Sequence, residues 1–334
     1  MYELAEVDEF RFSGYEPPYV LDLIPLASGL AAISSDGKLT LFDPAHIGRG
    51  PKCAYMTSHG NVTAAKALDA AGSVVATAGE NGTVALWDLR EPTQEAQATV
   101  QIGSCDMNVT SLACDTRTQS IAAGTELADH QASIIIWDLR AGTTPKVSYN
   151  DVHSDDVTEL NYHPTRSHIL LSGSTDGLVN ICDTQITDED EVVVQAFNHG
   201  SIHHAGFLND TEVYALSHDE KLALYDMAEE REAGSAIKDF GDIRQALNCQ
   251  YVASVVPKAG EVGAVLGAGS QDAKMFCLFH LTKNQEWAFA LESVVGLPGA
   301  HGSEIVRSFC VFDEQQTVYT CGEDGKIRAW RPPA

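Results

Sequence analysis

Three histidines precede a hydroxyl residue at a nearly constant spacing, an arrangement that could supply general bases for nucleophilic catalysis. The three pairs are His59 with Thr77, His153 with Ser172, and His301 with Thr320. Two of the pairs are followed by an aspartate at the same offset, Asp176 and Asp324. Because the pattern recurs along the chain, we interpret these residues as members of a structural repeat and predict no catalytic residue among them.

Two further groups of residues could point to metal or cofactor chemistry. His203 and His204 lie close to His199, but neighbouring residues on a strand point to opposite faces, so the pair is poorly placed to hold one ion. The glycine-rich run 263–269 is expected where strands approach closely. The sequence contains no Walker-type loop, HExxH, CxxC or GxSxG motif. We therefore expect a protein that is not an enzyme and has no metal or cofactor.

The histidine pattern belongs to a set of predicted β-hairpins. Residues 77–88, 172–183 and 320–330 align without gaps, and each has a β-prone run, an Asn-Gly or Asp-Gly turn and an alternating strand. This is a strong short-range hairpin signal. Weaker copies place the closing positions near residues 42, 87, 137, 182, 225, 278 and 330. Their spacing is close to the ~40–45 residues of a four-stranded propeller blade.

These hairpins and their closing Trp-Asp pairs resemble the WD-repeat family over essentially the whole chain. The resemblance implies an all-β, seven-bladed β-propeller in which a blade ideally holds a hydrogen-bonded set of His, Ser or Thr, Asp and Trp. The sets here are His59, Thr77, Asn81 and Trp87 in blade 2; His153, Ser172 and Asp176, with Cys182 for Trp, in blade 4; and His301, Thr320, Asp324 and Trp330 in blade 7. Within the family, the chain is most similar to the WD repeat-containing protein 89 group.

The two ends of the chain are expected to close the ring. Residues 3–12 alternate as a strand ahead of blade 1, and we predict that they form the outer strand of the last blade. Closure would remove the exposed sheet edges of an open stack of blades. No linker-like stretch divides the chain, so we predict a single domain over residues 1–334.

Charge is the most unusual feature of the composition. The 47 acidic residues against 21 basic ones give a net charge of −26, which favours basic protein partners over nucleic acid. Many acids fall in predicted turns and links on one face: Asp36, Glu80, Asp151, Asp155, Asp156, Asp219, Glu220, Asp272, Glu304 and Glu323. We expect such acids, above all Asp151, Asp155, Asp156, Asp219, Glu220, Asp272 and Glu304, to bind a basic partner such as a ribosomal protein or a histone. The alternative is that acidity only maintains solubility.

Other acids are predicted on the opposite face. They are residues 188–191 and, one blade later, Glu229, Glu230 and Glu232. A run of acids is usually a solvated loop, and acids on both faces weaken the case for one specific site.

A second candidate interface consists of two Trp-Asp-Leu-Arg boxes, residues 87–90 and 137–140. Similar paired boxes occur in propellers that serve as substrate receptors of cullin-RING ubiquitin ligases, where the arginine helps to dock the adaptor. The resemblance makes Arg90 and Arg140 candidates for adaptor docking, because arginine is a good interface anchor. The same boxes also occur as ordinary strand endings in which each arginine pairs with the aspartate of its own blade.

The remaining sequence features bear on location. No run of about 18 apolar residues occurs, and the acidic segment 1–6 is not followed by the apolar stretch of a secretory signal. The eight cysteines show no paired spacing, as expected for reduced thiols. We expect a cytoplasmic and/or nuclear protein that is not secreted, binds no membrane and is monomeric on its own.

Overall fold

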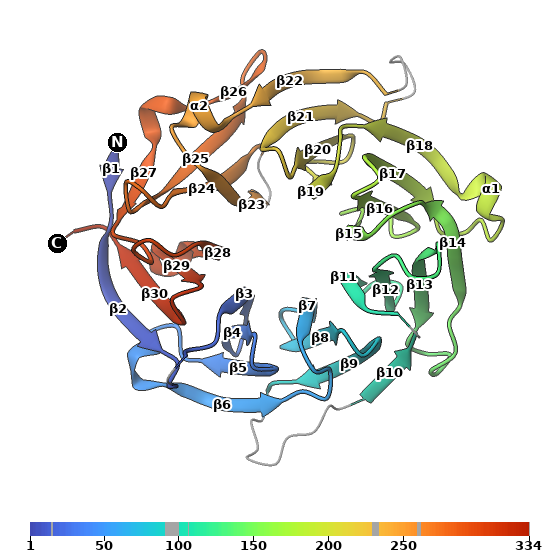
Figure 1. The fold of residues 1–334 in the computed structure, drawn as a ribbon, viewed down its shortest axis with the longest axis horizontal. Helices are drawn as coiled ribbons and strands as arrows, with labels where there is room; N and C mark the ends of the chain where they lie inside the picture. Colours follow the sequence, from blue (N-terminus) through green and yellow to red (C-terminus); the bar gives the residue numbers. More distant parts are fainter. Residues whose placement is uncertain (15, 91–99, 106, 229–233, 259–261, 334) are drawn as a thin grey trace.

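Seven β-sheets surround a central channel in the computed structural model, which describes all residues except 15, 91–99, 106, 229–233, 259–261 and 334. Figure 1 shows the sheets arranged as the blades of a ring. The predicted seven-bladed β-propeller is therefore confirmed. In each blade the chain enters at the innermost strand and moves outward.

The first four blades follow one another along the chain. Blade 1 consists of β3 (Val20–Leu26), β4 (Gly29–Ser34), β5 (Lys38–Phe42) and β6 (Pro51–Met56). Blade 2 consists of β7 (Val62–Asp69), β8 (Val74–Gly79), β9 (Thr83–Asp88) and β10 (Val100–Ser104). Blade 3 consists of β11 (Val109–Asp115), β12 (Ser120–Thr125), β13 (Ala132–Asp138) and β14 (Val147–His153). Blade 4 consists of β15 (Val157–Tyr162), β16 (Ile169–Ser174), β17 (Leu178–Asp183) and β18 (Val193–Asn198).

The last three blades include the strands from the N-terminus. Blade 5 consists of β19 (Ile202–Phe207), β20 (Glu212–Ser217), β21 (Lys221–Asp226) and β22 (Ala236–Asp242). Blade 6 consists of β23 (Tyr251–Pro257), β24 (Ala264–Ser270), β25 (Met275–Lys283), β26 (Trp287–Phe289) and β27 (Val295–Pro298), joined by β1 (Tyr2–Glu3). Blade 7 consists of β28 (Val306–Phe312), β29 (Thr317–Gly322), β30 (Lys326–Arg331) and β2 (Ala5–Arg11).

Among the described residues, helical segments occur only in the connections between strands. They are α1 (Glu189–Val192), α2 (Arg244–Leu247) and the 3₁₀ turns η1 (Ile47–Arg49), η2 (Leu291–Ser293) and η3 (Asp313–Gln315). No helix in the described part of the chain is long and apolar enough to cross a membrane.

The N-terminal segment closes the ring, as the alternating pattern predicts. Strand β2 pairs antiparallel with β30, with Ala5 opposite Arg331 and Arg11 opposite Lys326. Strand β1 pairs with β27 of blade 6, so one segment joins the last two blades. Seven apolar clusters, one at each junction between neighbouring blades of the described chain, complete the core.

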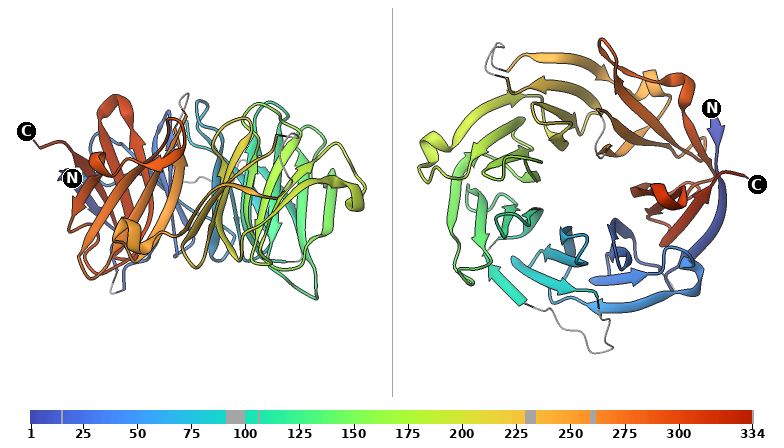
Figure 2. Two further views of the ribbon diagram at one scale, coloured as in Figure 1. Left: turned by 90° about the horizontal axis from the view of Figure 1, so that it is seen from above. Right: turned by 180° about the vertical axis from the view of Figure 1, so that it is seen from behind.

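The antiparallel order of the strands defines two faces of the disc, which Figure 2 shows edge-on in its left panel. The upper face carries the turns between the second and third strands of each blade and the links between blades. The lower face carries the other two kinds of connection. Turns with glycine at positive φ, such as Gly177 and Gly325, lie on the upper face, as expected for two-residue hairpin turns.

Blade 6 departs most from the predicted repeat. Its third strand, β25, runs from Met275 to Lys283, past the closing position expected near residue 278. In its second strand, a Cβ atom on Gly269 would lie 2.2 Å from the ring of Tyr251. Close packing therefore accounts for the glycine-rich run, which lies in β24.

Candidate functional site

The repeated histidines lie in buried hydrogen-bond networks. In blade 7, Trp330 Nε1 donates to Thr320 Oγ1 at 2.9 Å, and His301 Nε2 lies 2.9 Å from the same hydroxyl. His301 Nδ1 lies 2.6 Å from Asp324 Oδ1. Burial opposes ionisation of Asp324, but the hydrogen bond and charge of His301, together with the charge of Arg328, outweigh it and lower the carboxyl pKa.

Blades 2 and 4 hold variants of this network. His153 contacts Ser172 Oγ at 2.8 Å and Asp176 Oδ2 at 2.9 Å, and Cys182 is fully buried at the tryptophan position. In blade 2, His59 Nε2 and Trp87 Nε1 both lie 2.7 Å from Thr77 Oγ1. His59 Nδ1 meets Thr83 instead of Asn81, which accepts a hydrogen bond from Thr83. The hydroxyls of Thr77 and Thr320 each serve two ring nitrogens and that of Ser172 serves one, an arrangement that suits support of the blade.

Most of the predicted acidic residues lie on the upper face. Asp155, Asp156 and Glu304 lie in links between blades, and Asp36, Glu80, Asp219, Asp272 and Glu323 lie in turns. Asp151 does not. It lies in the outer strand β14, where its backbone N–H donates to Glu189 Oε1 at 2.9 Å. The loop assignment of Asp151 is wrong because the strand continues to His153.

Glu220 also departs from the expected exposed rim. It is only 8% exposed and has φ of 59°, at the turn where other blades have glycine. Its Oε2 atom has no hydrogen-bond partner among the described residues. Burial raises the pKa of its carboxyl to about 7. Glu220 is therefore not part of an exposed acidic rim, and its role in partner binding stays a prediction.

The upper face of blades 2–4 carries a group of acids without basic neighbours. The connections on this face, residues 57–61, 80–82, 105–108, 126–131, 154–156 and 175–177, contain no Lys or Arg. We call Glu80, Glu126, Asp129, Asp155 and Asp156 the acidic sector. Asn61 Nδ2 donates to Glu80 and Asn108 Nδ2 donates to Glu126, each at 2.7 Å. These partners are neutral amides and not counter-ions.

Elsewhere on the upper face several acids are paired with cations, whereas Asp272 and Glu304 accept from the neutral side chains of Gln250 and Ser303. Asp36 pairs with Lys38, Asp242 with Arg244 and Glu323 with Arg307, and Asp219 Oδ2 lies 3.9 Å from Lys221 Nζ. Between residues 67 and 220, every Lys or Arg lies on the lower face: Arg90, Arg117, Arg140, Lys146 and Arg166. The cations of this stretch are thus confined to the lower face, whereas acids occur on both faces.

The second predicted acidic cluster lies on the lower face at α1. Asp188 caps this helix by accepting from the backbone of Asp190, and Glu189 contacts β14. Residues Glu229, Glu230 and Glu232 lie outside the described residues.

The two arginine boxes lie on the lower face, opposite the acidic sector. Arg90 and Arg140 are 65% and 67% exposed, and each guanidinium group bonds the aspartate two residues earlier. The hydrogen bonds from Arg140 lower the pKa of Asp138 to about 2. Both arginines therefore show the pairing of an ordinary strand ending while remaining accessible.

The central channel contains a cavity of about 720 Å³ that the sequence did not suggest. Every innermost strand has a register shift near its first residue. Such bulges re-aim side chains. The residues that follow the shifts include Asp22, Glu159, His204, Ser254 and Ser308, all of which line the cavity.

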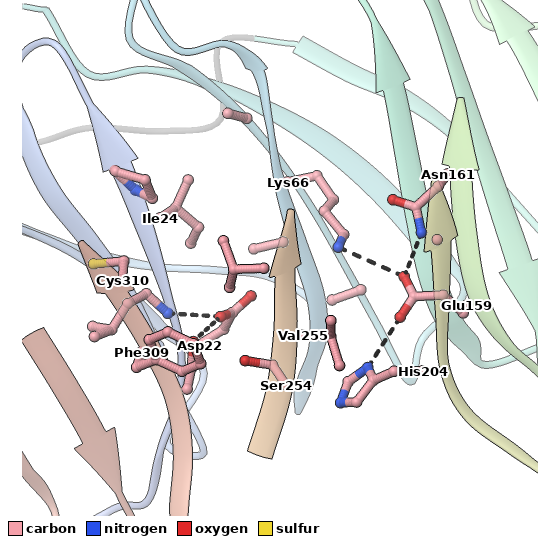
Figure 3. Close-up of a pocket in the computed structure, with 18 of the residues that line it drawn as sticks. Asp22, Ile24, Lys66, Glu159, Asn161, His204, Ser254, Val255, Phe309 and Cys310 are labelled. Atoms are coloured by element: carbon pink, nitrogen blue, oxygen red, sulfur yellow. Dashed lines mark hydrogen bonds and ion pairs between the residues drawn. The ribbon is translucent and has the colours of Figure 1, made fainter. Parts of the chain in front are cut away.

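Charged groups in this cavity form two clusters (Figure 3). Glu159 accepts from His204 Nδ1 at 3.1 Å and from Asn161 at 3.2 Å, and lies 3.8 Å from Lys66 Nζ. Burial would raise the pKa of Glu159, but Lys66 and His204 together lower it. In the second cluster, Asp22 Oδ1 accepts from Ser308 Oγ at 2.7 Å and from the backbone of Leu23 at 2.8 Å.

The expectation that His203 and His204 point to opposite faces of a strand is wrong, because β19 has a bulge at this place. The rings of His203 and His204 lie 4.2 Å apart, whereas regular alternation predicts opposite faces. His218 stacks on His203 at 5.0 Å. Burial, followed by repulsion from His204 and His218, lowers the pKa of His203 to about 3. His199, which lies close to this pair in the sequence, instead contacts Tyr225 Oη at 3.0 Å.

Across the described residues, no group of three or more His, Cys, Asp or Glu side chains could hold a metal ion.

A sequence signal for the channel residues did exist. Asp22 interrupts an otherwise apolar innermost strand, Val20–Leu26, and Glu159 is the charged residue of the innermost strand Val157–Tyr162. In a closed propeller the innermost strand of each blade borders the channel. A charged side chain on such a strand must therefore point either into the channel or into the interior of the blade.

Comparison with known proteins agrees with the blade structure. The family described as WD domain, G-beta repeat matches residues 51–88, 145–183 and 293–331. An uncharacterized WD repeat-containing protein of Saccharomyces cerevisiae is 35% identical over 222 residues, 66% of this chain and 55% of that protein. The match thus spans about half of that relative's length.

Two other relatives extend the comparison. An uncharacterized WD repeat-containing protein of Schizosaccharomyces pombe is 29% identical over 338 residues, 96% of this chain and 97% of that protein. A WD repeat-containing protein 89 homolog of Dictyostelium discoideum is 26% identical over 247 residues, 71% of this chain and 62% of that protein.

Proposed function

From the premise that this chain is a WD-repeat protein, we propose that it is a non-catalytic interaction scaffold that binds or escorts a basic protein. WD-repeat propellers generally hold other proteins, and fold alone does not identify the partner. We place the chain in the WD repeat-containing protein 89 group, on the similarity to the Dictyostelium homolog. We further propose that it acts in the cytoplasm and/or nucleus.

The absence of Lys and Arg from the upper-face connections of blades 2–4 carries this proposal. The acidic sector has no Lys or Arg in its own connections, and two of its carboxylates, Glu80 and Glu126, accept from asparagine amides. A surface of one sign attracts a partner of the opposite sign and speeds its association. A ribosomal protein or histone, with its basic segments, fits such a surface.

A second candidate function is that of a substrate receptor for a cullin-RING ubiquitin ligase. The observation in its favour is that Arg90 and Arg140 are exposed in the same geometry on neighbouring blades of the lower face. Exposed arginines with their guanidinium groups fixed in orientation are suitable docking points. Their pairing with Asp88 and Asp138 favours the structural alternative.

Affinity capture of the tagged protein at low and high salt distinguishes the two functions. The scaffold proposal predicts recovery of a basic protein at low salt that is lost as salt rises, because exposed charges are screened over ~8–10 Å. The receptor proposal predicts a ligase adaptor that resists salt and disappears when Arg90 and Arg140 are both changed to Ala. A dominant partner that is neither basic nor salt-sensitive would contradict the scaffold proposal.

A further inference from the structure

The two carboxylates of the central channel differ in how they are neutralised. Glu159 has Lys66, His204 and Asn161 around it. Asp22 has no cation within 4.0 Å among the residues that the structure describes, and its hydrogen bonds involve Oδ1 alone. Burial raises the pKa of Asp22, as expected for a carboxyl group without a counter-ion.

Asp22 is held in a fixed position at the cavity. Ser308 Oγ and the Leu23 backbone both donate to Oδ1, which leaves Oδ2 as the free acceptor. Ser254 lines the same cavity, and its hydroxyl makes no hydrogen bond to any described residue. Figure 3 shows Asp22 and Glu159 on opposite sides of the view, with the Lys66 side chain extending toward Glu159. The cavity thus presents an acceptor that is oriented but unpaired.

Most polar lining residues of the channel lie toward the upper face, the cation Arg307 among them, whereas Lys66 and Asn161 lie further along their strands toward the lower face. Asp22 and Glu159 are the third residues of their strands, which begin at the upper face. Pro25, Pro164 and Pro257 line the same cavity at or beyond the lower ends of the inner strands. A cationic group would therefore find its counter-charge by entering from the side that carries the acidic sector.

We propose that the channel receives one lysine or arginine side chain of the bound partner, whose cationic head pairs with the Asp22 carboxylate. The cavity volume of about 720 Å³ falls within the ~300–1,000 Å³ of small-ligand sites, so it accommodates a single side chain. This inference rests on the proposed function, since it assumes a basic partner. It adds a specific anchor to the diffuse attraction of the acidic sector.

Lys66 provides an internal control for this site. Its Nζ atom belongs to the Glu159 cluster, and its charge also acts on Asp22. An incoming cation is repelled by Lys66, so the Lys66→Gln variant should bind the cation more tightly. The Asp22→Asn variant keeps the size of the side chain and removes the charge, so it should bind more weakly.

The test uses small probes and the full chain. Binding of N-acetyl-arginine amide and N-acetyl-lysine amide is compared with that of their neutral counterparts, the citrulline and norleucine amides, by NMR titration. We expect the cationic probes to bind with a Kd on the order of 1 mM and the neutral ones to bind at least about tenfold more weakly. Asp22→Asn should abolish this preference, and Lys66→Gln should increase it.

Controls separate this inference from the proposed function. Glu286→Gln removes an exposed acid of the lower face, 81% exposed, and should leave probe binding unchanged. Circular dichroism melting shows whether each variant is folded. If cationic and neutral probes bind alike, or if folded Asp22→Asn retains the preference, the channel site is wrong. The scaffold proposal would survive that result, because it depends on the acidic sector.

Discussion

The indole nitrogen of Trp330 donates to the hydroxyl of Thr320 at 2.9 Å, within a network that also includes His301 and Asp324. Trp330 is 1% exposed and packs in the apolar cluster between blades 6 and 7. It thus contributes both apolar burial and a polar contact to the blade that receives the N-terminal strand β2.

Trp330→Ala should destabilise the protein by about 3–5 kcal/mol, because it leaves a large cavity and removes a donor from the network. Urea or thermal unfolding measures this loss. Trp330→Phe, which retains most of the ring but not the N–H group, should lose less. Unfolding of Trp330→Ala at the wild-type midpoint would show that the blade 7 network does not support the fold.

Blade 3 lacks the corresponding hydroxyl. Trp137 is fully buried, and its Nε1 atom has no partner among the described residues. Ala123 pairs with Ile135, as Thr77 pairs with Ala85 in blade 2, so Ala123 occupies the position of Thr77. Ala123→Ser should give the indole an acceptor and stabilise the protein by about 0.5–1.5 kcal/mol.

Ala122→Ser is the matched control for this prediction. Ala122 is also fully buried but faces the apolar cluster between blades 3 and 4. A hydroxyl there should cost about 1–3 kcal/mol. If Ala123→Ser and Ala122→Ser changed the free energy of unfolding equally in urea, residue 123 would not be the position from which a hydroxyl accepts from Trp137.

Glu220 should make stability depend on pH. Its carboxyl pKa is raised by burial from 4.5 to about 7, so the folded protein binds this proton more tightly than the unfolded chain. The contribution of Glu220 is therefore most favourable at low pH and is lost as pH rises from about 4.5 through 7. Relative to Glu220→Gln, the wild type should lose up to about 3 kcal/mol over this range, at ~1.4 kcal/mol per pKa unit.

Urea unfolding of both proteins at a series of pH values tests this effect. Asp219→Asn serves as the control, since Asp219 is exposed in the same turn. A constant difference in stability between wild type and Glu220→Gln would contradict the raised pKa of the Glu220 carboxyl.

The fold was predictable because its signals are local. Asn81-Gly82, Asp176-Gly177 and Asp324-Gly325 specify tight turns, and each precedes an alternating strand. The ring closure followed from a strand-like segment that had no partner near it in sequence. Blade 6 was predicted least well, since its turn lacks glycine and β25 continues beyond the usual length.

The candidate site was less predictable because its features depend on tertiary structure. A bulge in β19 brings His203 and His204 together against the usual alternation. Glu220 occupies a turn yet is buried against the next blade. The members of the acidic sector come from separate connections, because the chain alternates between the two faces at every strand, so their proximity depends on the fold.

The sharpest test of the scaffold proposal compares two variants that each lose five negative charges. One carries Gln or Asn at the acidic sector, Glu80, Glu126, Asp129, Asp155 and Asp156; the other carries them at exposed lower-face acids, Asp190, Glu191, Glu286, Asp313 and Glu314. Fluorescence anisotropy measures their affinity for a labelled oligolysine peptide at low salt. We expect the sector variant to bind about tenfold more weakly than wild type, and the lower-face variant to remain close to it. Equal weakening in both variants would mean that only the total charge matters, and would contradict a specific binding surface.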